Sequence, residues 1–227
     1  MFYILGFLYA DGHVETNNTL RFNISRRDRH ILEDIKEEMG YNGKIVDYTA
    51  RASGKEYESS RMSIMYKGIG EDLKALGRER LKEESMDMSL IPEEYELDFI
   101  AGFFDGDGSV KVRKQTHNKK NSVTYQIISL IGTKSHSILD DIQERLQKYG
   151  LRKKNICRVA KKNVYEITYS TMDSYKLYDL FYKERKGDIF LHRKKARYEE
   201  GFALRDEDHK RKAELEERKL KNVKDDL

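Results

Sequence analysis

The chain has 227 residues, of which 37% are charged, against about a quarter in an average globular protein. Its formal net charge of +4 is uneven, because residues 1–96 carry −5 and residues 97–227 carry +9; a basic half is a weak indication of a polyanionic partner. A single cysteine, Cys157, excludes an internal disulfide, and no apolar run is long enough for a membrane span. We therefore expect an intracellular protein of one or two domains, without a secretion signal.

The chain opens on an apolar stretch that ends in Asp-Gly and that returns 96 residues later. The two copies read ILGFLYADG (Ile4–Gly12) and IAGFFDGDG (Ile100–Gly108). If each copy is a helix, its small residues lie four apart on one face, and such residues allow two helix backbones to approach closely. These small residues are Gly6 and Ala10 in the first copy and Gly102 and Gly106 in the second. The spacing therefore predicts a pair of packed motif helices.

The elements after each motif also repeat, and the segments HILEDI and SILDDI match closely. Alternating or β-branched runs predict strands, and apolar residues at helical spacing predict helices. In the first half a strand follows the motif, further strands are expected at 19–25, 44–50 and 61–66, and helices within 27–45 and at 69–76. In the second half strands are expected at 108–115, 124–132, 156–160 and 164–170, and helices within 134–154 and at 174–183. Each half thus has the order αββαββα, which predicts an α+β fold of two pseudo-symmetric subdomains.

The boundary between the halves contains the only proline, Pro92, followed by two glutamates. Proline fits the first turn of a helix and acids suit its positive end, so the second motif helix is predicted from about Pro92 to Asp107. We divide the chain into an N-terminal subdomain, a linker, a C-terminal subdomain and a charged tail. Their bounds are 1–77, 78–95, 96–204 and 205–227. The tail is predicted to be a solvated helix or a disordered segment.

Packed motif helices would bring Asp11 and Asp107 together at the same end. Two carboxylates at helix C-termini repel each other and oppose the helix dipoles, and divalent cations relieve both costs. Oxygen ligands with open water positions suit Mg²⁺, and such ions support phosphodiester hydrolysis. A lone Asp-Gly is usually a turn, and the small residues could serve packing alone, but the repeat favours a paired metal site. The glycine after each Asp is expected to let the chain turn sharply into a strand.

The doubled motif resembles that of the LAGLIDADG family of homing endonucleases, which maps onto Ile4–Gly12 and Ile100–Gly108. Two motifs in one chain, each followed by the remaining elements of an αββαββα half, resemble the family's monomeric members over residues 1 to about 200. The resemblance implies that each half carries a four-stranded antiparallel sheet. It further implies that the two sheets form a saddle over the DNA major groove, with the motif helices packed at the interface.

The resemblance also implies the metal site. Asp11 and Asp107 would be catalytic and would bind Mg²⁺, and the carbonyls of Ala10 and Gly106 would contact the ion. Mn²⁺ would substitute for Mg²⁺, and Ca²⁺ would bind without supporting cleavage.

Other motif and basic positions also match the family. The first acidic position of the motif is Asp105 in one copy and Tyr9 in the other, and family members vary there. Lys194, in FLHRKKAR, matches a basic residue that the family uses around metal-bound waters, and Lys82 matches it more loosely in the first half. We include both lysines among the candidate catalytic residues; an ordinary phosphate contact or a solvated surface position is the alternative for each.

The saddle can be checked against strand patterns. In residues 108–115, Val110 and Val112 would face the helices, so that the intervening basic and amide side chains face DNA, where Arg and Lys pair with guanine and Gln with adenine. The run 124–132 is apolar on both faces and leaves its register open. The predicted DNA-binding residues are Glu15, Asn17, Arg21, Asn23, Arg26, Arg61, Ser63, Lys111, Arg113 and Gln115. Two acid-free basic runs, 111–120 and 152–162, suit phosphate contacts.

We therefore predict a monomeric, metal-dependent, site-specific double-strand DNA endonuclease with a long, partly asymmetric target. Each motif Asp would serve cleavage of one strand. The resemblance implies cuts across the minor groove with short 3′ overhangs, and a gene of the mobile-intron type. Two alternatives on the same fold stay open: an RNA-binding intron maturase, and a DNA-binding regulator that does not cleave.

Overall fold

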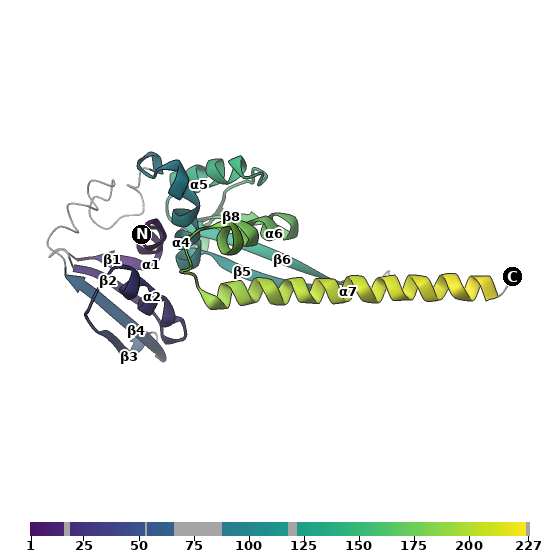
Figure 1. Ribbon diagram of the computed structural model, residues 1–227, viewed down its shortest axis with the longest axis horizontal. Coiled ribbons are helices and arrows are strands. Elements are labelled where there is room, and N and C mark those ends of the chain that lie inside the picture. The colour runs from purple at the N-terminus through teal and green to yellow at the C-terminus, as the bar shows by residue number, and fades with distance from the viewer. Residues whose placement is uncertain (16–18, 53, 66–87, 118–121, 226–227) are drawn as a thin grey trace.

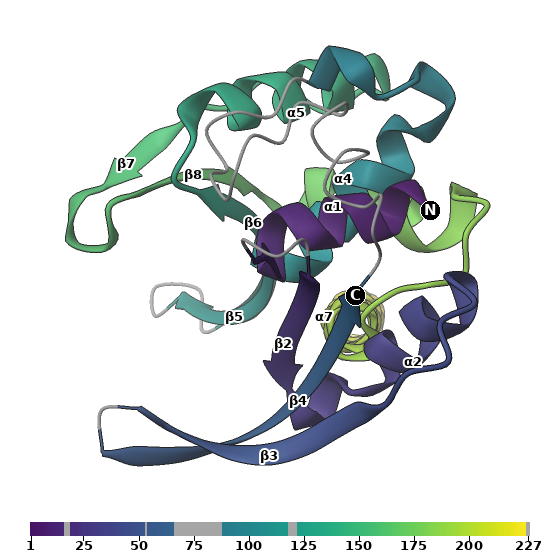
Figure 2. The ribbon, with the colours of Figure 1, turned by 90° about the vertical axis from the view of Figure 1, so that its left-hand side faces the viewer.

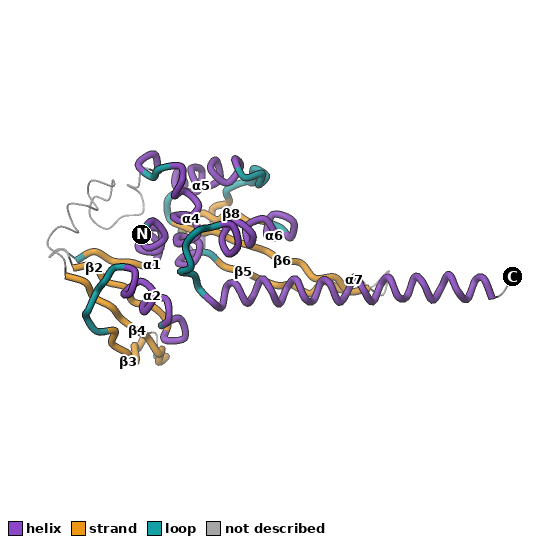
Figure 3. The backbone as a smooth tube through the Cα atoms, in the orientation of Figure 1, coloured by secondary structure: helices purple, strands orange, loops and turns teal. Residues whose placement is uncertain are grey.

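A computed structural model describes residues 1–15, 19–52, 54–65, 88–117 and 122–225 of the chain (Figure 1). Two antiparallel four-stranded sheets flank a central helix pair, and helices cover one face of each sheet (Figures 1 and 3). The strand orders are β1-β2-β4-β3 and β5-β6-β8-β7, so each strand of one sheet has its counterpart at the same place in the other. This confirms the predicted α+β fold with two pseudo-symmetric halves.

The described elements of the first half are α1 (Phe2–Asp11), β1 (Gly12–Val14), β2 (Thr19–Ser25), a 3₁₀ turn η1 (Arg26–Asp28), α2 (His30–Glu38), β3 (Ile45–Ala52) and β4 (Lys55–Met65). Those of the second half are α4 (Glu96–Asp107), β5 (Ser109–His117), β6 (Ser122–Thr133), α5 (His136–Lys148), β7 (Cys157–Val159), β8 (Val164–Tyr169), α6 (Thr171–Asp179), a π-helical turn η7 (Leu180–Glu184) and α7 (His192–Asp225). The helix predicted at 69–76 and most of the predicted linker lie outside the described residues.

Helices α1 and α4 pack side by side at the centre of the molecule (Figure 2). A Cβ atom built on Gly6 would lie 2.0 Å from the carbonyl oxygen of Phe99, and one built on Gly102 would lie 2.0 Å from that of Tyr3. The two contacts are reciprocal, because each residue of one helix is matched by the residue 96 positions later in the other. Backbone thus touches backbone at both glycines, as the small-residue spacing predicted.

Strand β2 alternates as expected, with Leu20, Phe22 and Ile24 buried and Arg21 and Asn23 on the opposite face. Helix α2 lies against one face of the first sheet, and α5 lies against one face of the second (Figure 2). We call the opposite face of each sheet, which these helices do not cover, its outer face. Arg21 and Asn23 lie on the outer face of the first sheet.

The structure resolves the register of β6, which the sequence left open. Ile127, Ser129 and Ile131 are fully buried, so Ile128 and Leu130 lie on the outer face. Apolar outward residues explain why the sequence pattern was ambiguous.

Helix α7 is a single helix that continues through residue 204, where the sequence suggested a subdomain boundary. In its N-terminal third, the space for a Cβ on Gly201 is limited by Ile127 and Val112, at 2.8 and 2.9 Å, so this stretch packs on β5 and β6. Its C-terminal part projects beyond the body (Figures 1 and 3). The tail backbone is therefore helical through Asp225, in agreement with the first of the two predicted states.

The second motif helix begins at Glu96, four residues after the predicted start. Residues Glu93–Tyr95 form a 3₁₀ turn whose N-cap is Pro92, so the proline introduces a short tight turn before the α-helix.

The glycine after each motif Asp lies where the chain leaves the helix for a strand, as predicted. Gly12 and Gly108 have extended backbones, with φ of −89° and −79°, and not the left-handed conformation of a glycine helix cap. A Cβ on either residue would lie 2.6 or 2.4 Å from the carbonyl oxygen of Leu8 or Phe104. Glycine is therefore required because the strand leaves so close to the last turn of the helix.

Candidate active site and nucleic-acid interface

The motif aspartates lie where the two central helices end. Asp11 closes α1 and Asp107 closes α4. A Cβ on Gly106 would lie 2.2 Å from the Cβ of Ala10 and 3.4 Å from the backbone nitrogen of Asp11, so the helix ends are in contact. The structure thus brings all four predicted metal-site residues to one end of the helix pair.

Asp11 stands at a cavity of about 190 Å³ on the first-half side of this end. Partial enclosure by protein raises the pKa of its carboxyl group, and the positive charges of Lys194 and Arg193 oppose that rise. The residue nevertheless stays exposed to solvent. The cavity is lined by Phe7, Asp11, Asn23, Ile24, Ser25, Arg27, Asp28, Leu191 and Arg193.

An ion pair joins the two halves across this cavity. The Nε of Arg193, on α7, donates to both carboxylate oxygens of Asp28, at 2.9 and 2.8 Å. Asp28 is only 5% exposed, and the Nε of Arg27 also lies 3.9 Å from it. Sequence reasoning missed Asp28 and Arg193, because the partners are 165 positions apart; the only local signal is one acid within the basic run RRDRH.

Lys194 is buried against the end of α4 and is 2% exposed. Its Nζ donates to the carbonyl oxygens of Phe104, Asp105 and Gly106, at 2.5, 2.6 and 3.4 Å. These carbonyls belong to the last turn of the helix, where they have few partners within the helix and where a cation is favoured by the dipole. Burial lowers the pKa of Lys194 to about 8, against the opposing charge of Asp105.

Asp105 holds the segment that carries Lys194. It is 1% exposed and accepts hydrogen bonds from the Tyr3 hydroxyl at 2.7 Å, the Leu191 backbone N–H at 2.8 Å and the Tyr182 hydroxyl at 3.2 Å. Burial raises the pKa of the Asp105 carboxyl group, and Lys194 opposes the rise. The first acidic position of this motif is therefore a buried anchor between α1, α4 and the start of α7.

The donor set at the helix ends suits a hard divalent cation. Asp11 and Asp107 offer carboxylate oxygens and Ala10 and Gly106 offer carbonyls, all of them hard oxygen donors. The Gly106 carbonyl already accepts a long bond from Lys194, but a carbonyl has a second lone pair. Among the described residues no three His, Cys, Asp or Glu side chains gather as a metal cluster, so water or substrate oxygens would have to complete the coordination.

Residues 94–181, which run from the 3₁₀ turn before the second motif to the π-helical turn η7, match the LAGLIDADG-like domain family. This segment of the chain is similar to that family. No curated protein matches the sequence. The resemblance drawn from the doubled motif is thus confirmed, for residues 94–181, as similarity to this family.

The fold of the whole chain is similar to that of three solved structures. The homing endonuclease I-WcaI bound to its DNA recognition sequence has 15% identity and a TM-score of 0.60, over 86% of this chain and 84% of that one. The I-LtrWI LAGLIDADG homing endonuclease bound to target DNA has 14% identity and a TM-score of 0.53, over 90% and 89%. A double mutant of I-SmaMI has 15% identity and a TM-score of 0.51, over 81% and 84%. At this identity the likeness establishes a shared two-domain fold.

The outer face of the first sheet carries a connected polar cluster. The guanidinium of Arg61 lies 4.6 Å from the ring centre of Tyr48, and the Tyr48 hydroxyl is hydrogen-bonded to the amide oxygen of Asn23. Arg21 pairs with Glu15 at 2.7 Å and reaches Ser63 at 3.4 Å. Five of the predicted DNA-binding residues therefore share this face; Tyr48 was not predicted.

The outer face of the second sheet is simpler. Lys111 and Arg113 are exposed on β5, and Gln115 is hydrogen-bonded to Gln126 of β6 at 3.2 Å. Val112 packs toward α7, which agrees with the predicted alternation. The three predicted side chains of this strand therefore lie on one face.

Arg26 does not join the outer face. It pairs with Glu58 at 2.8 Å and with Asp47 at 3.4 Å, and Asp47 bonds Ser60, which is buried on the α2 side of the sheet. The structure thus directs Arg26 away from the predicted DNA face, because acidic side chains on the other side of the sheet bind it. Asn17 and Lys82 lie outside the described residues.

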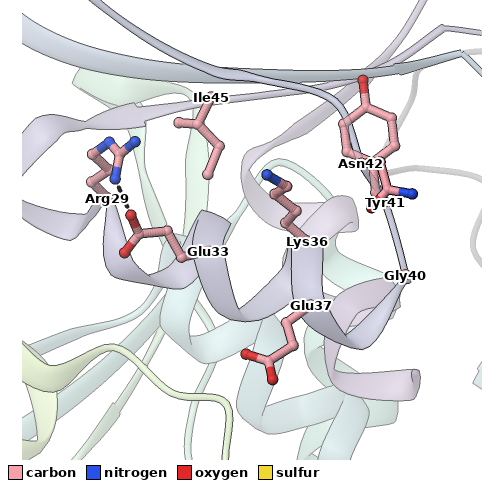
Figure 4. Close-up of a pocket in the computed structure, with 8 residues that line it drawn as sticks. All are labelled: Arg29, Glu33, Lys36, Glu37, Gly40, Tyr41, Asn42 and Ile45. Carbon is pink, nitrogen blue, oxygen red and sulfur yellow. Dashed lines mark hydrogen bonds and ion pairs between the residues drawn. The ribbon is translucent and has the colours of Figure 1, made fainter.

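A larger hollow, of about 440 Å³, lies between α2 and the start of β3 (Figure 4). It contains none of the predicted site residues, and an ion pair between Arg29 and Glu33 lies within its lining. Among the helices of the described part of the chain, none is both long and apolar enough to cross a membrane.

Proposed function

We propose that the protein is a site-specific DNA endonuclease that cuts both strands of a long, partly asymmetric target in a divalent-metal-dependent reaction. The observation that carries the proposal is the pair of aspartates at the abutting ends of α1 and α4, next to two sheets whose outer faces present Arg, Lys, Asn and Gln. The likeness to solved homing endonucleases supports it as a likeness of fold.

Asp11 and Asp107, with the Ala10 and Gly106 carbonyls, would hold Mg²⁺, which when bound supplies an activated water and stabilises the leaving 3′ oxygen. Lys194 would keep the end of α4 in place by bonding its last carbonyls, and Asp105 would keep the start of α7 against that helix. Each aspartate would serve one DNA strand. Lys194 and Lys82 would also each act on a metal-bound water, one in each half.

The sheets would read the DNA. Arg61 and Asn23 can each make bidentate contacts with a base edge in the major groove, as can Arg113 and Gln115 in the other half. Because the two outer faces carry different residues, the two half-sites would differ in sequence. Exposed Lys111 and the basic run 152–162 would contact phosphates, so binding should weaken as the salt concentration rises.

The test is a randomised duplex library incubated with the protein and Mg²⁺, followed by sequencing of the cut ends. The proposal predicts one enriched, non-palindromic sequence with cuts on both strands. Enriched sequences that are bound but never cut would overturn it in favour of a non-cleaving regulator. Preference for a structured RNA over every duplex, without cleavage, would overturn it in favour of a maturase.

A further inference from the structure

Arg193 belongs to the second half of the chain, but its side chain lies in the first-half cavity. Its own helix begins against α2, where the His192 and His30 rings stack with 3.9 Å between their centres. Successive residues of a helix point about 100° apart, so two neighbouring residues of α7 can contact different parts of the molecule. Lys194 turns to the end of α4, while Arg193 turns to Asp28 and the cavity of Asp11.

Asp28 orients the guanidinium of Arg193 but binds only one of its three nitrogens. Its hydrogen bonds to Asp28 both come from Nε. Its two terminal nitrogens donate no hydrogen bond to the described part of the chain, and 41% of its side chain is exposed. A buried carboxylate thus fixes the group through Nε and leaves up to four N–H donors on a side chain that lines the same cavity as Asp11.

The second half lacks the anchor for such an arginine. The matching segments HILEDI and SILDDI align Asp28 with Ser135. The Ser135 hydroxyl caps α5 by accepting the backbone N–H of Ile138 at 3.5 Å, and it carries no charge that could hold a guanidinium. The two pseudo-equivalent sites are therefore chemically different at this position.

Resting on the proposed function, we propose that Arg193 binds the phosphate cleaved at the Asp11 site, with Asp28 as its positioning residue. Its terminal N–H groups would donate to the non-bridging oxygens of that phosphate, and the donors are already aligned before DNA binds. The guanidinium keeps its proton throughout, so water attack and departure of the 3′ oxygen need no proton from it. The second half thereby completes the site of the first half, and, because Ser135 stands where Asp28 does, the described residues offer the other strand no arginine anchored in this way.

The first experiment measures each strand separately, in single-turnover cleavage of the target found by the library, with a different label on each strand. Asp11→Asn identifies the strand that depends on the Asp11 site. Arg193→Ala should slow that strand by about 10²-fold, the usual effect of removing one donor to transition-state charge, and change the other by less than about threefold. A nicked duplex should accumulate, and Arg193→Lys should restore part of the rate.

Three further variants separate chemistry from folding. Asp28→Asn should slow the same strand with little change in the concentration needed for half-maximal rate. Arg193→Gln keeps a donor for Asp28 and should fold even if Arg193→Ala does not. Arg197→Ala is the matched control, because Arg197 lies on the same helix, pairs with Glu200 and is 42% exposed; it should leave both rates unchanged.

A second readout needs no metal. Binding is measured in EDTA with the natural duplex and with one that carries a neutral methylphosphonate at the phosphate assigned to Asp11. Arg193→Ala should weaken binding of the natural duplex by about tenfold, the size expected for a charge-assisted contact, and leave the neutral duplex unchanged.

Equal slowing of both strands by Arg193→Ala, slowing of only the Asp107 strand, or equal loss of binding to both duplexes would overturn the assignment of Arg193. Failure of the wild-type protein to cut any sequence would instead overturn the proposed function.

Discussion

Replacing Gly102 by alanine tests the geometry that brings the two aspartates together. The new Cβ would lie 2.0 Å from the Tyr3 carbonyl oxygen, whereas real Cβ contacts essentially never fall below 3.0 Å, so the helices must separate by at least about 1 Å. Because the opposing atom is backbone, we expect a cost at or above the upper end of the about 1–3 kcal/mol typical of overpacking. The higher helix propensity of alanine offsets about 1 kcal/mol of this loss in the free energy of unfolding.

The net loss of about 2 kcal/mol should lower the melting temperature by roughly 4–8 °C in a chain of this size, as measured by calorimetry. Gly6→Ala should cost the same, because its contact with Phe99 is the reciprocal one. The double variant should lose less than the sum, since one separation makes room for both methyl groups. Exchange of Ala203 for glycine, at an exposed position of α7, measures the propensity effect alone.

Stabilisation by either alanine, several-fold different effects of the two, or full additivity would refute the close reciprocal contact. Cleavage by Gly102→Ala should also fall, by on the order of 10²-fold for a displacement near 1 Å, because both helix ends carry a candidate metal ligand.

Three other predictions concern the buried cation, the outer face and the metal. Because the pKa of Lys194 is about 8 when folded and near 10.5 when unfolded, the unfolded state binds more protons between these values, so stability should rise with pH there by up to about 1.4 kcal/mol per unit. Denaturant titrations in EDTA should show this rise relative to Lys194→Met, and its absence would contradict the burial of the charge. Tyr48→Phe keeps the ring beside Arg61 but loses the bond to Asn23, so the cleavage library should relax at one base position, whereas Tyr48→Ala should relax two; unchanged profiles would exclude this cluster from base reading. Removal of divalent ions should abolish cleavage; Mg²⁺ or Mn²⁺ should restore it, and Ca²⁺ should restore specific binding only, as followed by gel electrophoresis and band shift.

The helix pair was predictable because its cause is local. Small residues four apart within each copy, and copies 96 apart in the chain, define which faces meet, and the contacts of Gly6 and Gly102 follow from that pattern. The strand faces of β2 were predictable for the same reason, since polar and apolar side chains alternate with period two. In β6 both faces are apolar, and only the packing of helices on one of them, such as α7 against Ile127, distinguishes the two.

The rest of the site depends on contacts between distant parts of the chain. Asp28 and Arg193 form a pair only because α7 begins beside the first half, and nothing in the local sequence of either residue indicates the other. Lys194 was selected as a catalytic candidate, but its hydrogen bonds to the end of α4 could not be foreseen. Arg26 was expected at the DNA face and instead binds Asp47 and Glu58, because sequence alternation does not extend into the turn that follows β2.

The central claim is that Asp11 and Asp107 each serve one strand, and strand-resolved cleavage of the library-derived target by Asp11→Asn and Asp107→Asn tests it most directly. The account predicts that each variant binds the target in Ca²⁺ as the wild type does. It also predicts that each loses cleavage of at least one strand with Mg²⁺, and that the strand most affected differs between the two. Double-strand breaks by either variant at the wild-type rate would contradict it.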